Sequence, residues 1–321
     1  MKKILLASTA LVLSAGLAHA QAVRITGEGR MGIMYTNAGG GVWAQENRLQ
    51  FNFNVAVEAD HGLTFGAWTR ARITNGGTIV SPGVPAVFDA GADGIAGTGD
   101  DVLIAPAIAE VRGGFFSGSR VWVEANGFRL TFGNVDGAFR GAGVSHGYLG
   151  GCGVGYEGGQ QCGDAAGLLA VTQGQASTGG GPAARVRIDY TMGDTRVALS
   201  HDRGASTEIG IRTRFDAFTV AVGYTNNTAG IPVWALSGHY NGGAWGVGAL
   251  IASDNTVTNY SLSGNVALGG GNLYGYVGRV NGSNAVGLNY GYGLGGGATL
   301  SVGAERVGAL TTASVGVAFN F

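Results

Sequence analysis

Hydrophobic and polar residues alternate along most of this chain, and residues 48–73 show the pattern most clearly. In RLQFNFNVAVEADHGLTFGAWTRARI, apolar side chains occupy most alternate positions on both sides of the turn Asp60–Gly62. Because successive side chains of a β-strand point to opposite faces, this segment is predicted to be a hairpin with one oily face and one arginine-bearing face. The oily face could form a soluble core, or it could meet lipid while the polar face lines a water-filled lumen.

The same alternation predicts about sixteen strands. They are 22–36, 46–60, 62–75, 119–126, 128–135, 183–192, 195–203, 206–216, 218–227, 232–241, 244–253, 257–268, 272–281, 284–294, 298–307 and 311–321. Alternating segments of about ten residues joined by short turns are typical of transmembrane β-barrels. An even number places both chain ends on the periplasmic side, and 14 or 18 strands are the alternatives.

The N-terminus has the features of an export signal. Two lysines precede an apolar run, Ile4–Leu17, and the sequence Ala18-His19-Ala20 follows. This order is typical of a secretory signal peptide, so residues 1–20 are predicted to be removed, leaving 21–321. A membrane anchor is the alternative, although the run is short for a span. No later stretch is apolar enough for a membrane helix, which leaves a soluble exported protein or a closed barrel.

Composition narrows the function classes. The 63 glycines follow no G-X-Y period, which excludes collagen. The 19 basic and 20 acidic residues nearly cancel, which excludes the broad basic field of a nucleic-acid binder. All basic residues after Lys3 are arginines, whose planar guanidinium keeps its charge. Ten of them are predicted to form rows of fixed charge along a pore: Arg24, Arg30, Arg48, Arg70, Arg72, Arg129, Arg185, Arg187, Arg212 and Arg214.

Two long insertions, 76–117 and 136–182, interrupt the strands, and loops of this length are usually functional. The first contains FDAGADGIAGTGDD, which resembles the calcium loops of bacterial surface proteins. Carboxylates interleaved with glycines suit Ca²⁺, although the order departs from an EF-hand and a solvated acidic turn is the alternative. The predicted ligands are Asp89, Asp93, Asp100 and Asp101. No cofactor is predicted to be required, and a bound Ca²⁺ would be structural.

The second insertion holds the only two cysteines, Cys152 and Cys162. In an exported chain they predict a disulfide, with two free thiols as the alternative. Closing this loop would stabilise it by roughly 2–4 kcal/mol in the chain-entropy model. The bond would shape the loop inside or at the mouth of a pore. The chain is not predicted to be an enzyme, because its adjacent Ser-His pairs lack a nucleophile elbow.

The whole chain resembles the alphaproteobacterial general porins. The resemblance is most specific in VRITGEGRMGIMY (23–35), RLQFNFNVAVEADHGLTFGAW (48–68), GFRLTFGNVDGAF (127–139) and the final VGVAFNF (315–321). It implies an all-β, 16-stranded antiparallel barrel that forms homotrimers in the bacterial outer membrane, in contact with lipid and lipopolysaccharide. The last strand, which ends on Phe321, resembles the insertion signal of outer-membrane proteins.

The resemblance also implies that the third extracellular loop, 136–182, folds into the lumen and narrows it. Asp136, Glu157 and Asp164 would then face arginines of the first three strands, and opposed charges would sort ions and dipolar solutes. This loop departs from the family pattern because it is rich in glycine and poor in acids. We therefore expect weak selectivity or even a preference for anions.

The leading hypothesis is a porin for passive diffusion of ions and small hydrophilic solutes. A solute-specific porin is the alternative within that class. A structural or adhesive barrel, whose loops bind a surface ligand or calcium, is the alternative from another class. A soluble secreted β-protein is a third reading, but it predicts short repeats of fixed period that the sequence lacks.

Overall fold

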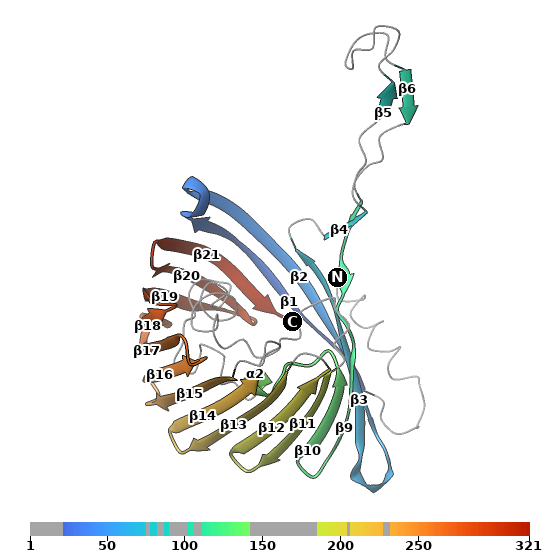
Figure 1. Cartoon of the computed structure of the whole chain (residues 1–321), viewed down its shortest axis with the longest axis vertical. Coiled ribbons are helices and arrows are strands. Elements are labelled where there is room, and N and C mark those ends of the chain that lie inside the picture. The colour runs from blue at the N-terminus through green and yellow to red at the C-terminus, as the bar shows by residue number, and fades with distance from the viewer. Residues whose placement is uncertain are drawn as a thin grey trace.

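Sixteen long strands form a closed antiparallel barrel in the computed structural model of this protein (Figure 1). The structure describes residues 22–74, 78–81, 87–89, 102–105, 111–141, 185–203, 206–226 and 232–321. The strands of the barrel are β1 (Ala22–Thr36), β2 (Val42–Glu58), β3 (Thr64–Thr74), β9 (Arg120–Ala125), β10 (Phe128–Gly133), β11 (Arg185–Met192), β12 (Thr195–Asp202), β13 (Thr207–Phe215), β14 (Phe218–Asn226), β15 (Pro232–Asn241), β16 (Trp245–Ser253), β17 (Thr258–Leu268), β18 (Gly271–Val280), β19 (Ser283–Gly295), β20 (Ala298–Val307) and β21 (Leu310–Asn320).

The predicted fold class and strand count are confirmed. Strand ends differ from the predicted ones by a few residues, most of all at β2, which begins at Val42 rather than at residue 46. The reason is that β2 stays in register with β1 up to the pair Thr36↔Val42, with Tyr35 packed on Trp43 at a ring distance of 4.9 Å. Hydrophobic alternation is weak in this stretch, whereas cross-strand pairing continues.

Several short elements accompany the barrel. They are the 3-10 turns η1 (Ala38–Gly40) and η2 (Asp60–Gly62), the helical turn α2 (Ala138–Gly141), and the strands β4 (Thr78–Ser81), β5 (Val87–Asp89), β6 (Val102–Ala105), β7 (Val111–Gly113) and β8 (Phe115–Phe116). Strand β8 is an extra strand that pairs with β3. The first insertion contains the ribbons β4–β7 and β5–β6, which extend away from the barrel in Figure 1. The described residues include no helix long and apolar enough to cross a membrane.

Strands β1 and β21 close the barrel. Their antiparallel register runs from Glu28↔Asn320 to Thr36↔Thr312. At the end of the seam, Gly27 N–H donates to Phe321 O at 2.7 Å and Phe321 N–H donates to Gly27 O at 3.1 Å. The last residue therefore completes the ladder that joins the first strand to the last. Whether it also serves as an insertion signal stays a prediction.

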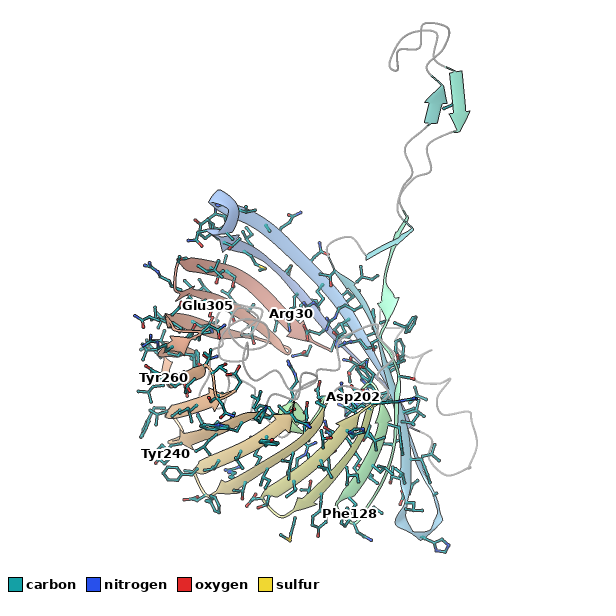
Figure 2. All side chains as sticks on the ribbon, in the orientation of Figure 1. Arg30, Phe128, Asp202, Tyr240, Tyr260 and Glu305 are labelled. Carbon is teal, nitrogen blue, oxygen red and sulfur yellow. The ribbon has the colours of Figure 1, made fainter. Side chains whose placement is uncertain are left out.

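The two faces of the barrel differ in chemistry, as the alternation predicts. Large apolar side chains are exposed on the outer face; Leu262 and Leu288, for example, are 60% and 57% exposed. Arg30 and Asp202 lie toward the interior in Figure 2, whereas Tyr260 lies on the outside. An apolar outer band and a polar interior are the arrangement of a barrel that crosses lipid. The oily face in residues 48–73 is therefore the lipid-facing side.

Aromatic side chains gather on the outer face at one end of the barrel, where β9 turns into β10, β11 into β12 and β13 into β14. The turns at this end are called the short turns below. Phe128 stacks on Tyr190 with ring centroids 4.2 Å apart, and Tyr240 packs on both Phe218 and Trp245 at 4.8 and 5.1 Å. Amphipathic rings at the strand ends match the interfacial girdle of a membrane protein.

Because Gly287 of β19 has no side chain, the ring of a tyrosine from the neighbouring strand lies across the inner face of the sheet. Tyr276 of β18 lies opposite Gly287, and Gly287 lies opposite Glu305 of β20. The Tyr276 ring lies over Gly287, where an added Cβ would be 2.2 Å from the ring, and its hydroxyl donates to Glu305 Oε2 at 2.9 Å. Tyr276 and Glu305 are both buried. A glycine in a strand interior often marks such a close approach.

We expect Gly287→Ala to destabilise the barrel by about 1–3 kcal/mol, because overpacking would displace the Tyr276 ring and its hydrogen bond. Gly291→Ala is the matched control: it lies on the same face of the same strand, where an added Cβ meets only ordinary contacts at 3.7 Å or more. Urea unfolding in detergent measures both variants. Equal midpoints would contradict the proposed packing role of Gly287.

Candidate functional site

The inner wall of β1–β3 carries a cluster of guanidinium groups. Its arginines are Arg30, Arg48, Arg70 and Arg72. Arg30 lies directly opposite Arg48 in the β1–β2 register. In the β2–β3 register, Arg70 lies opposite Asn52 and Arg72 lies opposite Gln50. The strand pairing thus brings four predicted pore-lining arginines together on one face.

Polar neighbours hold this cluster in place. Arg72 donates from Nε and Nη2 to Gln50 Oε1 at 2.9 and 2.6 Å, and Gln50 donates to Asn52 Oδ1 at 3.0 Å. The carboxylate of Glu28 forms an ion pair with Arg30 and lies 3.9 Å from Arg48 Nη1. The carboxylate of Glu28 thus contacts two of the four guanidiniums, and the arginines of this cluster outnumber it, which gives this face a local excess of positive charge.

Arg120 of β9 extends this positive wall. Its guanidinium lies 4.1 Å from the ring centre of Trp68, and that of Arg70 lies 5.5 Å from the same ring. Cation–π contacts of this kind orient a guanidinium without neutralising it. Arg120 is not among the predicted pore-lining arginines, although it alternates with the outward-facing Val121 and Val123 and could be found from that parity.

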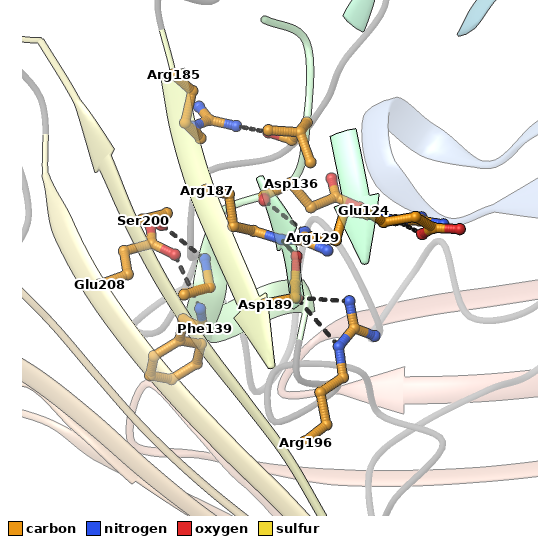
Figure 3. Close-up of polar contacts among 12 residues, drawn as sticks. Glu124, Arg129, Asp136, Phe139, Arg185, Arg187, Asp189, Arg196, Ser200 and Glu208 are labelled. Carbon is orange, nitrogen blue, oxygen red and sulfur yellow. Dashed lines mark hydrogen bonds and ion pairs between the residues drawn. The ribbon is translucent and has the colours of Figure 1, made fainter. Parts of the chain in front are cut away.

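Beyond Arg120, the inner wall of β9–β12 has a different character, because its other arginines form ion pairs (Figure 3). Arg129 pairs with Glu124, and its Nε donates to Oε2 at 2.6 Å. Asp189 accepts from Arg187 at 2.8 Å and from Arg196 at 2.7 Å. Negative and positive side chains therefore alternate across this part of the wall, in contrast to the arginine cluster of β1–β3.

Arg185 and Arg187 face inward but are buried by neighbouring groups. Arg185 pairs with Asp202 at 2.7 Å and donates to the carbonyl oxygen of Val135. Arg187 donates to Asp189 and, at 2.7 Å, to the carbonyl oxygen of Asp136. Removing one partner of a buried ion pair leaves an uncompensated charge, so such pairs are strong positional constraints. Both side chains hold the beginning of the second insertion against the wall.

The described start of that insertion runs along the inner wall. In α2, Ala138 N–H donates to Ser200 Oγ at 2.7 Å and Phe139 N–H donates to Glu208 Oε2 at 3.0 Å. The Phe139 ring is fully buried against β14, where an added Cβ on Gly223 would be 2.8 Å from it. Residues 135–139 are thus fixed to β11–β14 by backbone and side-chain contacts.

The remaining predicted arginines lie nearer the short turns. Arg24 is exposed near the beginning of β1. Arg212 is half-buried and lies opposite Arg196 in the register of β12 and β13. Arg214 is exposed, and its Nε donates to the carbonyl oxygen of Asp216 at 2.9 Å. All three occupy inward-facing positions, and their role as pore-lining residues stays a prediction.

The inner wall of β14–β21 is almost neutral. Its inward positions carry small or uncharged residues such as Ala221, Ala235 and Asn259, all buried. The titratable Asp, Glu, His, Lys or Arg side chains described on that face are His239 and Glu305. Charge is therefore concentrated on one side of the lumen.

Other predicted site residues lie outside the described part of the chain. They are Glu157, Asp164, Cys152, Cys162, Asp93, Asp100 and Asp101, together with residues 1–20 and most of 136–182. Asp136 is described: its carboxylate lies 4.0 Å from Arg140 Nε. Asp89 is the last residue of β5. Within the described ranges there is no group of three or more His, Cys, Asp or Glu residues that could hold a metal ion.

Comparison with solved structures supports the fold. Three variants of the porin from Rhodopseudomonas blastica superimpose with TM-scores of 0.67, 0.66 and 0.66, at 21%, 21% and 22% identity. Each alignment covers 94% of this chain and 100% of the porin. No curated protein sequence matches this chain.

The family comparison covers nearly the whole sequence. The family model described as Gram-negative porin matches residues 7–310. It agrees with the closed barrel, the apolar outer face and the charged inner wall. The chain therefore belongs to the Gram-negative porin family, and it is an outer-membrane channel for the passive diffusion of small solutes.

Proposed function

We propose that this porin is a trimeric general diffusion channel with a preference for anions. The observation that carries the proposal is the arginine cluster of β1–β3, in which Arg30, Arg48, Arg70 and Arg72 share one face and the carboxylate of Glu28 contacts only the first two. Rings or rows of fixed charge in a narrow pore set the preferred sign of the permeating ion. The nearly neutral wall of β14–β21 opposes this field only weakly.

The proposed constriction is the loop 136–182. In this proposal it folds into the lumen, and Asp136, Glu157 and Asp164 are its acids. The contacts of Ala138 and Phe139 with Ser200 and Glu208 support an inward course for its first turn. Because the loop has few acids, it would offset the wall arginines only in part.

Arg185 and Arg187 have a revised role in this proposal. Both are among the ten arginines that the sequence predicts to line the pore. Their burial and their bonds to the carbonyl oxygens of Val135 and Asp136 favour a role in fixing the loop. Selectivity would then depend mainly on the arginines of β1–β3 and on Arg120.

Further parts of the proposal come from the sequence. They are a cleaved signal peptide, a disulfide between Cys152 and Cys162, a structural Ca²⁺ site at Asp89, Asp93, Asp100 and Asp101, and contact with lipopolysaccharide. We propose no catalytic role and no required cofactor. The competing proposal is a structural or adhesive barrel, in which the second insertion plugs the lumen and no ion current passes.

Reconstitution in a planar bilayer tests the channel directly. We expect stepwise conductance in multiples of three and a reversal potential in a KCl gradient with the sign of Cl⁻ preference. A folded barrel without conductance would favour the structural or adhesive reading.

The double substitution Arg70→Gln and Arg72→Gln should lower the Cl⁻/K⁺ permeability ratio several-fold. A unit charge about 4 Å from an ion interacts with it by about 1 kcal/mol at the dielectric of water, so losing two charges weakens anion attraction. The control is Arg279→Gln with Arg306→Gln, two exposed arginines whose Nε atoms donate to backbone carbonyls at strand ends. The reversal potential measures both. An unchanged value in the first variant would contradict the assignment of the cluster.

Glu208→Ala should raise single-channel conductance and current noise, because α2 loses its acceptor for Phe139 N–H. Glu208→Gln keeps an oxygen acceptor and should behave like the unsubstituted protein. Single-channel recording compares the two. Identical current traces for Glu208→Ala and Glu208→Gln would show that the hydrogen bond between Phe139 N–H and Glu208 does not hold the loop.

Mass spectrometry of the protein isolated from outer membranes tests the processing proposals. We expect an N-terminus at Gln21 and a peptide linking Cys152 to Cys162 that an alkylating reagent modifies only after reduction. Modification before reduction would exclude the disulfide, and detection of residues 1–20 would exclude the cleavage.

A further inference from the structure

A row of alternating charges lies on the inner wall of β9–β12, near the short turns. Arg129 is the direct cross-strand partner of both Glu124 and Asp189. Arg196 then contacts Asp189 Oδ1 through Nε at 3.1 Å and through Nη2 at 2.7 Å. The order around the wall is therefore carboxylate, guanidinium, carboxylate, guanidinium. This row differs from the arginine cluster, where one sign of charge prevails.

These charges line a pocket of about 500 Å³. Its walls include Glu124, Arg129, Asp189, Thr191 and Arg196, and Gly62 lies at its rim. Small-molecule sites commonly have volumes of about 300–1,000 Å³, so an amino acid or a dipeptide fits within this one. Residues of five separate strands, β3 and β9 to β12, converge on it because the strand register sets them side by side.

The charged groups of the pocket are held in place yet accessible. The side chains of Glu124, Arg129 and Arg196 are 38%, 46% and 39% exposed, whereas Asp189 is only 5% exposed. The buried Asp189 fixes Arg196, and the Trp122 ring lies 5.3 Å from the Arg129 guanidinium. In their ion pairs, Arg129 and Arg196 use Nε and Nη2. The N–H groups on Nη1 take no part in these ion pairs.

We propose that this pocket binds zwitterionic solutes, namely α-amino acids and dipeptides, as they pass the mouth of the channel. The ligand carboxylate contacts Nη1 of Arg129 and Arg196, and the ligand ammonium contacts Glu124. A simple anion would meet the repulsion of Glu124 and Asp189, and a simple cation that of two guanidiniums. Specificity therefore arises from both attraction and repulsion.

Three probes of similar size separate these cases: glycylglycine carries both charges, N-acetylglycine only the negative one and glycylglycinamide only the positive one. Each is added to the side of the bilayer that faces the short turns, and the reduction of the KCl current is measured. We expect glycylglycine to act at concentrations about tenfold lower than the other two, equal to about 1.4 kcal/mol. Equal action of all three probes would overturn the proposal.

Glu124→Gln should abolish the advantage of glycylglycine, because the amide keeps a hydrogen-bonding oxygen for Arg129 but removes the charge that attracts the ammonium. The control Asp216→Asn makes the same charge change in the turn between β13 and β14, outside this pocket. If Glu124→Gln keeps the tenfold preference, the pocket is not the binding site. The KCl current without probe shows independently whether the channel is open, so failure of this proposal is distinguishable from failure of the proposed diffusion function.

Discussion

Closure of the sheet is the constraint on which the rest of this structure depends. Lipid offers no hydrogen bonds, so a sheet that spans a membrane must pair both of its edges. Here the pairing of β1 with β21 removes the last free edge, and Phe321 exchanges two backbone hydrogen bonds with Gly27. Once the sheet is closed, the period of two in each strand assigns every residue to the lipid or to the lumen. The charged wall is a consequence of that assignment.

The lumen gathers charge unevenly because neighbouring strands place their inward residues in register. On β1–β3 the register sets arginines beside arginines, and Glu28 compensates only part of the charge. On β9–β12 it sets Arg129 between Glu124 and Asp189. The same residue type therefore has different consequences on two parts of one wall. In our proposals the first part favours anions, and the second binds a dipolar solute.

Buried contacts have a third consequence, because they position the described start of the second insertion. Arg185 and Arg187 donate hydrogen bonds to the backbone carbonyls of Val135 and Asp136. Glu208 accepts a hydrogen bond from the backbone N–H of Phe139. Gly137 lies between these contacts, and an added Cβ there would be 2.0 Å from Glu208 Oε2. Arginines that sequence reading treats as a single set thus divide into those that meet solvent and those that hold the chain.

The sequence by itself determined the strands, their faces and most of their ends to within two residues, because lipid on one side and water on the other impose an alternation of apolar and polar residues that is visible in the local sequence. It also placed the arginines on the polar face. Only the tertiary structure decided which charges meet. Glu124 and Arg129 are near in sequence, but Asp189 joins them across the long insertion, and Glu208 reaches Phe139 from another strand. Pairing between distant segments depends on strand register and barrel closure, and neither can be predicted from a local sequence pattern.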